Sequence, residues 1–265
     1  MLSLEDILRR LSMWQDVEQK IHAFFQARGF VYVRTPLVVA CPGMEPNLDP
    51  LEVSVNGEQR ALMTSPEYAM KKLMGAGMEK VYTITPVFRN FEEGKHNTPE
   101  FTMLEWYAPG TYEDLMRETE ALLQFVLEDR SCWSHLTYQQ AQVDAYGDPH
   151  TNLKRFFVTQ YPCAQASLAR LSQDGMCAER FEAFGDGMEL CNGFCELLDP
   201  VEQRRRFTLE QEEHRTAGKT VFPIDEELLE ALGQMNGPIY GNALGVDRLV
   251  MLKYAIDDIR DIHVF

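Results

Sequence analysis

Two strand-like segments joined by a polar loop constrain the fold of this 265-residue chain most strongly. Residues 81–90 (VYTITPVFRN) and 100–107 (EFTMLEWY) are rich in β-branched and aromatic residues, whereas residues 91–99 (FEEGKHNTP) are mostly polar. Runs of β-branched and aromatic residues favour strands, and a short polar segment between two such runs favours a turn. The three segments therefore predict a long antiparallel hairpin.

The other strand-like segments show the same hairpin arrangement. Segments 51–55 and 60–64 flank an Asn-Gly pair, the strongest short hairpin signal. Residues 30–40 read as a strand that Pro36 confines to a sheet edge or a strand end. Further short strands are expected at 156–161, 179–184 and 187–198.

The helical segments are set apart from these strands. Apolar residues at three- and four-residue steps predict one long helix from about Leu4 to Phe25, with Ser3 as its N-cap and Gly29 as its stop. Other helices are expected at 66–74 (after Ser65 as N-cap), 111–128, 199–217 and 225–233, and from Val246 onward. Because the βαβ alternation of a parallel sheet is missing, the chain is predicted to be α+β with an antiparallel sheet.

The charge of the chain narrows the classes of partner. Lys and Arg total 25 against 41 Asp and Glu, so the formal net charge is −16, which disfavours broad electrostatic binding to nucleic acid. No stretch reaches the roughly 20 apolar residues of a membrane span, and the N-terminus lacks the apolar run of a signal peptide. We therefore expect a cytoplasmic protein with no membrane partner. Its six cysteines include no CxxC pair and are expected to be reduced thiols.

Three acidic residues, Glu182, Glu189 and Glu196, recur at seven-residue intervals. On a regular strand Glu189 and Glu196 face opposite sides, unless a bulge at Asn192-Gly193 resets the alternation. One interpretation is that these acids face solvent. The other is that they hold a cation, magnesium or an ammonium group, because carboxylates among apolar neighbours are costly without one.

Two arginines are candidates for binding an anion. Arg89 ends an otherwise apolar strand, and Arg248 lies in the first turn of a helix directly after the glycine-containing string GNALGVD. Planar guanidinium groups commonly grip phosphate oxygens, and a helix start adds free N–H groups. The glycine spacing alone is a weak signal, and the pattern alone favours Phe101 as a core residue.

Several longer strings resemble a known family. The order of the first helix and Pro36, then VFRN…PEFTMLEWY, then GNALGVDRLVML resembles motifs 1, 2 and 3 of class II aminoacyl-tRNA synthetases. TSPEYAMKKL and MELCNGFCELLD are similar to the lysyl-tRNA synthetase branch, and in particular to its stand-alone paralogues that modify elongation factor P. The resemblance covers about residues 1–129 and 156–265.

The resemblance implies an overall architecture. It implies a six- or seven-stranded antiparallel sheet flanked by helices and a homodimer built through the first helix. It also implies one catalytic domain over residues 1–265, in which 130–155 is a short variable connection between motifs 2 and 3.

The resemblance also implies roles for individual residues, with ATP and Mg²⁺ as cofactors. Arg89 matches the arginine that grips the α-phosphate and the substrate carboxylate, Phe101 the ring that stacks on adenine, and Arg248 the arginine on the γ-phosphate. The residues matched to the ATP site are Arg89, Asn90, Phe91, Thr98, Phe101, Glu189, Leu190, Gly245 and Arg248. Those matched to the pocket for a lysine-like amino acid are Ser65, Pro66, Glu67, Tyr107 and Glu196. Those matched to magnesium are Glu182 and Glu189.

The chain departs from the family pattern at three places. Phe91 stands where the family usually has a glutamate that contacts adenine, and Glu92 or Glu93 could serve instead. The usual His-Asn-Pro-Glu-Phe string contains an additional residue, Thr98, which shifts the loop register and the assignment of His96. Residues 130–155 are shorter than the insertion of the paralogues.

Three functions follow from these observations. The family chemistry forms an aminoacyl-adenylate by attack of the amino acid carboxylate on the α-phosphate. Because the first helix begins near residue 4, we expect no anticodon-binding domain, and with the acidic charge we do not expect tRNA as a partner. The first hypothesis is transfer of the amino acid to a protein lysine on elongation factor P. The second is the same activation with a carrier protein, a small molecule or tRNA as acceptor. The third is a non-catalytic amino-acid-binding paralogue, for which Phe91 is the only support.

Overall fold

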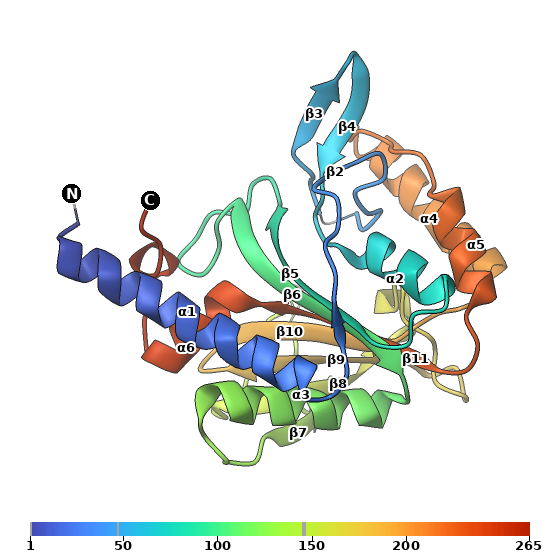
Figure 1. Cartoon of the computed structure of the whole chain (residues 1–265). Helices are drawn as coiled ribbons and strands as arrows, with labels where there is room; N and C mark the ends of the chain where they lie inside the picture. The colour runs from blue at the N-terminus through green and yellow to red at the C-terminus, as the bar shows by residue number, and fades with distance from the viewer. Residues whose placement is uncertain (1, 47, 145–146) are drawn as a thin grey trace.

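The computed structural model describes residues 2–46, 48–144 and 147–265, and it contains one large and one small sheet (Figure 1). The large sheet has eight strands in the order β1-β5-β6-β11-β10-β9-β8-β7, and the small sheet has the order β2-β4-β3. The strands are β1 (Val31–Tyr32), β2 (Val38–Val39), β3 (Glu52–Val55), β4 (Glu58–Leu62), β5 (Val81–Phe88), β6 (Glu100–Pro109), β7 (Ser134–Thr137), β8 (Arg155–Pro162), β9 (Cys177–Gly185), β10 (Met188–Cys195) and β11 (Ile239–Gly245).

The helices lie on both sides of the large sheet (Figure 1). They are α1 (Leu4–Gln26), α2 (Glu67–Gly75), α3 (Tyr112–Leu127), α4 (Pro200–Thr216), α5 (Glu226–Gln234) and α6 (Val246–Tyr254). Two short 3-10 helices are η1 (Cys163–Gln165) and η2 (Ile259–Asp261). None of the helices in the described ranges is long and apolar enough to cross a bilayer.

Six central strands of the large sheet pair antiparallel with their neighbours, as predicted. In sheet order they are β5, β6, β11, β10, β9 and β8. The strands at the two edges, β1 and β7, pair parallel to their neighbours and bring the total to eight. The predicted hairpins are confirmed, because β5 pairs with β6 and β3 pairs with β4. Asn56 and Gly57 have φ of 54° and 84°, as a tight hairpin turn requires.

Four elements differ from the sequence prediction. The strand expected at 30–40 is two short strands in different sheets, since β1 pairs with β5 and β2 pairs with β4 on either side of Pro36. The central strand β11 was not predicted, because the glycines within it are unfavourable in a strand interior. The segment 130–155 contains β7, although residues 145–146 lie outside the described residues. Helix α2 begins one residue later than expected, with Pro66 at the N-cap and the Ser65 hydroxyl still accepting the Glu67 N–H at 3.1 Å.

Helix α1 begins as predicted, but its apolar stripe is only partly buried. Ser3 and Asp6 form a capping box at its first turn. Toward the C-terminal half of the helix the stripe packs into the core, whereas Leu4, Leu8 and Leu11 remain exposed. This end of the molecule therefore presents apolar surface.

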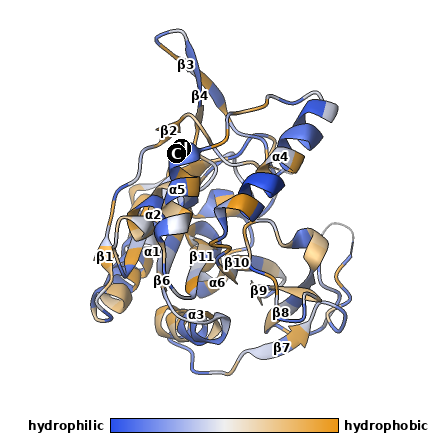
Figure 2. Cartoon of the chain, turned by 90° about the vertical axis from the view of Figure 1, so that its right-hand side faces the viewer, coloured by the Kyte–Doolittle hydropathy of each residue, from blue (hydrophilic) through white to orange (hydrophobic). Residues whose placement is uncertain are grey.

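The two faces of the large sheet have different coverings. One face packs against α1, α3 and α6, where Trp106 and Phe181 of the sheet belong to the same buried cluster as Phe25 of α1. The other face is covered in part by α2, α4 and α5, with Tyr107 and Ile239 in a second cluster. Figure 2 shows that α4 is largely hydrophilic, and only a few of its side chains are buried. The second face is therefore only partly covered by apolar packing, which leaves room for polar side chains to form a binding site there.

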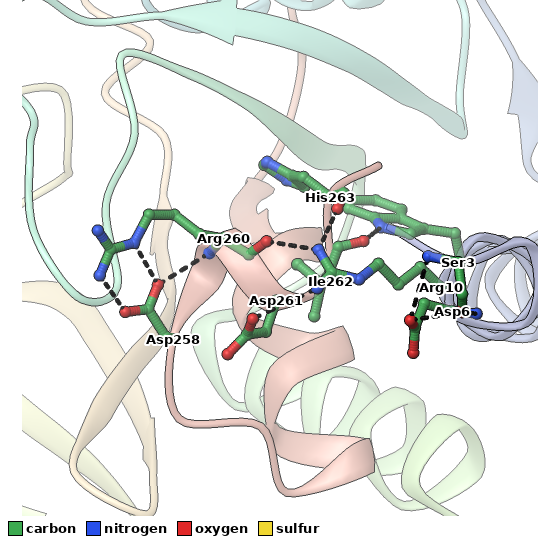
Figure 3. Close-up of polar contacts among 9 residues, drawn as sticks. Ser3, Asp6, Arg10, Asp258, Arg260, Asp261, Ile262 and His263 are labelled. Atoms are coloured by element: carbon green, nitrogen blue, oxygen red, sulfur yellow. Dashed lines mark hydrogen bonds and ion pairs between the residues drawn. The ribbon is translucent and has the colours of Figure 1, made fainter. Parts of the chain in front are cut away.

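The C-terminal segment is tied to α1 (Figure 3). The buried guanidinium of Arg10 donates to the carbonyl oxygens of Arg260, at 2.7 Å, and of His263. Trp14 Nε1 donates to the Ile262 carbonyl at 3.0 Å. These bonds join the two ends of the chain on the helix-covered side of the sheet.

Candidate active site

The strand register brings acidic and aromatic residues of three strands onto one face of the sheet. Glu105 and Tyr107 of β6 lie opposite Ala243 and Gly241 of β11, which in turn lie opposite residues 192 and 194 of β10. Residues opposite each other in a ladder share a face. This is the face beneath α2, away from α1, α3 and α6.

A β-bulge places the three regularly spaced acids on this same face. The register of β9 and β10 shifts between Glu189 and Cys191, so the bulge is at Leu190 and not at the predicted Asn192-Gly193. The shift cancels the odd spacing between Glu189 and Glu196. The face that carries Glu182 therefore carries Glu189 and Glu196 as well.

An acidic pocket forms where the first turn of α2 crosses β6 and the end of β10. The Glu105 carboxylate is fully buried and accepts hydrogen bonds from the Tyr107 hydroxyl, at 2.9 Å, and from the Ser65 hydroxyl. Lys71 Nζ lies 2.5 Å from Glu67 Oε1 and 2.5 Å from Glu196 Oε2. We define the acidic pocket as these residues: Ser65, Glu67, Lys71, Glu105, Tyr107 and Glu196.

One oxygen of the acidic pocket has no partner. Glu196 Oε1 is buried and takes no hydrogen bond from any residue that the structure describes. It lies over Gly241, where a Cβ atom would be 2.6 Å from this oxygen and 2.3 Å from Tyr107 Cε1. A glycine is therefore required at position 241, and a buried carboxylate oxygen is left for a donor from outside the protein.

Burial dominates the electrostatics of the acidic pocket. It raises the pKa of Glu105 to about 8, and the nearby charge of Glu67 adds to the effect. Burial also raises the pKa of Glu196 to about 8, although Lys71 opposes this shift. For Lys71, burial disfavours the charge, but Glu196 and Glu67 more than offset it and raise the lysine pKa. The pocket thus favours ligands that bring positive charge.

Arg89 lies beside the acidic pocket. Its Nε donates to the Thr64 carbonyl at 3.3 Å, and Thr64 directly precedes Ser65 of the pocket. Its guanidinium carbon lies 5.2 Å from the centre of the Phe101 ring. The two terminal guanidinium nitrogens take no hydrogen bond or ion pair within the described ranges and can bind an anion.

Arg248 lies at the start of α6 and is held by three acceptors. Its nitrogens donate to the His96 carbonyl at 3.3 Å, the Glu189 carbonyl at 2.7 Å and Asn97 Oδ1 at 2.9 Å. Gly245 precedes the helix, and a Cβ atom there would meet only Arg248 side-chain atoms, at 3.8 Å or more. Arg248 therefore connects the 91–99 loop to β10.

Glu182 and Glu189 form a pair of neighbouring acids. Glu182 accepts hydrogen bonds from the Tyr161 hydroxyl at 2.6 Å and from Arg180 at 2.5 Å. Burial and the like charge of Glu189 raise the pKa of Glu182 to about 7. No group of three or more His, Cys, Asp or Glu residues suited to a metal ion occurs in the described part of the chain. Two carboxylates remain enough for magnesium, which keeps several waters and binds phosphate oxygens.

Three predicted ATP-site residues lie differently from the others. The Leu190 side chain is buried against Leu252 in the core beneath α6, which leaves only its main chain for a nucleotide contact. Phe91 is 81% exposed with φ of 62°, and its N–H is bound by the Asn90 side chain. The Thr98 hydroxyl donates to the Glu100 carbonyl at 2.6 Å.

The sequence analysis missed four residues of this face, Lys71, Glu105, Arg180 and Asn192. Signals for two of them were present. Glu105 is a charged residue two positions from Tyr107 on a strand that is otherwise mostly apolar, and Lys71 is four positions after Glu67 on a helix. Arg180 Nε donates to Asn192 Oδ1 at 3.0 Å, a contact that depends on strand pairing.

The mostly antiparallel sheet packs against α1, α3 and α6 on one face and carries the acidic pocket and Arg89 on the other, with Arg248 at the start of α6. This arrangement defines the catalytic core of a class II synthetase. A family model described as tRNA synthetases class II (D, K and N) matches residues 2–265, and the chain belongs to this family.

The chain is also similar to named members of the family. It is 37% identical to an elongation factor P–(R)-β-lysine ligase of Edwardsiella ictaluri over 312 aligned positions, which cover 98% of this chain and 94% of the relative. Ligases of the same name from Salmonella paratyphi B and Salmonella heidelberg are 35% identical over 315 positions, with 99% and 95% of the two chains covered. Because these alignments are longer than 265 residues, the relatives carry additional residues inside the matched region.

Proposed function

We propose that this chain is a ligase that activates a lysine-like amino acid with ATP and transfers it to a lysine of elongation factor P. The observation that carries the proposal is the acidic pocket beside Arg89, in which Glu196 Oε1 is buried without a donor. A diamino acid supplies ammonium groups for the carboxylates and a carboxylate for the arginine. Support for the acceptor comes from the names of the relatives.

The pocket residues would bind and orient the amino acid. Glu105, Glu196 and Glu67 are the acceptors for its two ammonium groups, with Tyr107 and Pro66 forming the walls. Arg89 would hold the amino acid carboxylate and the α-phosphate together through its two free nitrogens. Bringing these reactants into contact is the main source of acceleration in such a reaction.

Phosphate and adenine contacts are proposed on the rest of the face. Phe101, whose ring lies beside Arg89, would stack on adenine. Arg248 would bind the γ-phosphate as an anion at the start of α6, next to Gly245. Preorganised donors of this kind stabilise charge that develops on the phosphates as the adenylate forms.

Glu182 and Glu189 would hold magnesium. Burial raises the pKa of Glu182, and the like charge of Glu189 adds to the shift; a divalent cation would relieve both effects. When bound, the ion would offset negative charge on phosphate oxygens. The hydrogen bonds from Tyr161 and Arg180 keep the Glu182 carboxylate oriented.

We also propose a homodimer of single catalytic domains. Leu4, Leu8 and Leu11 expose apolar surface on α1, and Val31 and Tyr32 do so on the edge strand β1. A second copy would cover both. Because the proposed acceptor is a translation factor, the reaction belongs in the cytoplasm, and the net charge of −16 favours a basic protein loop over tRNA as the second substrate.

The first experiment is ATP–pyrophosphate exchange with lysine, (R)-β-lysine, (S)-β-lysine and leucine. Exchange with a diamino acid and none with leucine is expected. Absence of exchange with every amino acid would favour the non-catalytic alternative, for which the exposed Phe91 is the specific observation.

The second experiment follows labelled amino acid into elongation factor P or into total tRNA, in the presence of ATP and magnesium. Label in the protein alone is expected, at a rate that falls as salt screens the charges of the two proteins. Label in tRNA and none in the protein would restore the synthetase alternative.

A further inference from the structure

Lys71 is a lysine buried inside an acidic pocket that is proposed to bind ammonium groups. It is 1% exposed, and its Nζ is 5.4 Å from the centre of the Phe194 ring. Lysine is almost never buried unless its charge is paired. The partners are Glu67 and Glu196, from α2 and from the end of β10, each at 2.5 Å.

The pairing divides the two oxygens of Glu196. Oε2 contacts the Lys71 ammonium, whereas Oε1, over Gly241 and beside the Tyr107 ring, has no donor among the described residues. An ammonium group that enters the pocket therefore finds one oxygen already taken and the other free.

We propose that Lys71 is a positioning and specificity-determining residue. It is a resident ammonium that fills the gap between Glu67 Oε1 and Glu196 Oε2 and leaves Glu196 Oε1, Glu105 and the second oxygen of Glu67 to the substrate. This inference rests on the proposed function. Without Lys71 the distal ammonium of the substrate would enter the gap instead. The substrate carboxylate would then be drawn away from Arg89, and binding would become unproductive.

Chemical rescue of Lys71→Ala tests the inference. The substitution removes three carbons and the ammonium, so it leaves space for a three-carbon amine next to two carboxylates. We expect the kcat of lysine-dependent exchange to fall by at least about tenfold while KM changes less, as loss of alignment requires. Adding n-propylammonium should restore much of the activity, whereas n-propanol, which fills the same space without charge, should not.

Lys72→Ala is the matched control, because Lys72 is the next residue of α2 and pairs outside the pocket with Asp225 and Glu227. It should keep the exchange activity of the unmutated protein. Equal rescue by n-propanol and n-propylammonium would show that Lys71 only fills space. Activity of Lys71→Ala within twofold of the unmutated protein would also overturn the proposal.

A thermal measurement covers the case in which Lys71→Ala does not fold. Lys71→Met keeps the volume but leaves Glu67 and Glu196 facing each other without a cation, and adding Glu67→Gln removes that repulsion. The double variant should melt at a higher temperature than Lys71→Met, while Glu67→Gln alone should melt lower than the unmutated protein. A double variant no more stable than Lys71→Met would contradict the resident ammonium.

The two proposals can fail separately. If the unmutated protein activates no diamino acid, the proposed function fails, and the thermal cycle still decides whether the Lys71 charge holds Glu67 and Glu196. If diamino acids are activated but the amine does not rescue Lys71→Ala, only the inference about Lys71 fails.

Discussion

The two arginines of the site differ in how the protein holds them. Arg89 donates a hydrogen bond within the protein through Nε alone. In Arg248, by contrast, all three guanidinium nitrogens donate, to residues of the 91–99 loop and of β10. Loss of Arg89 would therefore remove mainly the proposed contact to substrate, whereas loss of Arg248 would also release the loop. Both contacts depend on planar guanidinium geometry that lysine does not reproduce.

Arg89→Ala is expected to lower exchange activity by about a hundredfold or more, since it removes a preorganised donor from a charged transition state. Melting should change little, because only the bond to Thr64 and the contact with the Phe101 ring are lost within the fold. The exchange assay and a melting curve check this. Arg117→Ala, which removes an exposed arginine paired with Asp114, is the control and should be silent. Arg89→Ala with activity within a few-fold of the unmutated protein would remove Arg89 from the site.

The buried acids predict a pH dependence of stability. The pKa values of Glu105 and Glu196 are raised from 4.5 to about 8. Between these values the folded protein binds more protons than the unfolded chain, so the contribution of these two groups to stability falls as pH rises toward 8. The proposed substrate, lysine, would bind the ionised carboxylates, so the melting-temperature increase that it causes should grow over the same window.

Melting curves at pH 5, 6, 7 and 8, with and without lysine, measure both effects. Glu196→Gln removes one of the two titrating groups and should melt closer to the unmutated protein, or above it, as the pH increases. A constant difference between the two proteins across this range would contradict the raised pKa of Glu196.

At the scale of elements, β11 shapes the pocket because it has no side chain at position 241. Gly241 lies under Tyr107 and Glu196, and a methyl group there would lie 2.3 Å from Tyr107 Cε1. Real Cβ atoms do not approach so closely, so either the ring or the strand must move.

Gly241→Ala is therefore expected to abolish activation of lysine and to lower the melting temperature. The control is Gly233→Ala in α5, where a Cβ atom would meet only Pro200 Cγ, at 3.6 Å. Alanine is favoured over glycine in a helix, so this variant should be neutral or more stable. Full activity of Gly241→Ala would show that the pocket is looser than the structure describes.

At the scale of the whole molecule, three exposed leucines on one helix, α1, form an apolar surface that the monomer leaves uncovered. Leu8 is 57% exposed on the helix that also binds the C-terminal segment through Arg10 (Figure 3). A dimer through this helix would bury the leucines. Its interface would lie close to the C-terminal segment that Arg10 binds. His263 Nε2 is 2.7 Å from Asp247 Oδ1, so the C-terminal segment reaches the residue next to Arg248.

Leu8→Lys is expected to shift the protein from dimer to monomer, because it places a charge in the proposed interface. Sedimentation velocity measures the change. Val201→Lys, at a 77% exposed position on α4, is the control and should leave the assembly unchanged. An unmutated protein that sediments as a monomer at high concentration would contradict the dimer.

Local signals in the sequence were sufficient for most elements and for the family. The capping residue Ser3, the Asn-Gly turn and the alternating strands at 81–107 act through neighbours in the chain, so their structures were predictable. The motif strings around Arg89 and Arg248 were enough to indicate class II synthetase chemistry, because each motif is short and continuous.

Contacts between distant segments were decided only in the tertiary structure. Lys71 pairs with Glu196, and Glu105 with Ser65, across long separations in the chain, so no local pattern reports them. The position of the bulge at Leu190 and the division of residues 30–40 between two sheets depend on which strands pair. Strand β11 is stable despite its glycines because β6 and β10 hydrogen-bond to it on both sides. Burial among these elements is also what raises the pKa of the pocket acids, since the sequence sets their identity but only packing removes their water.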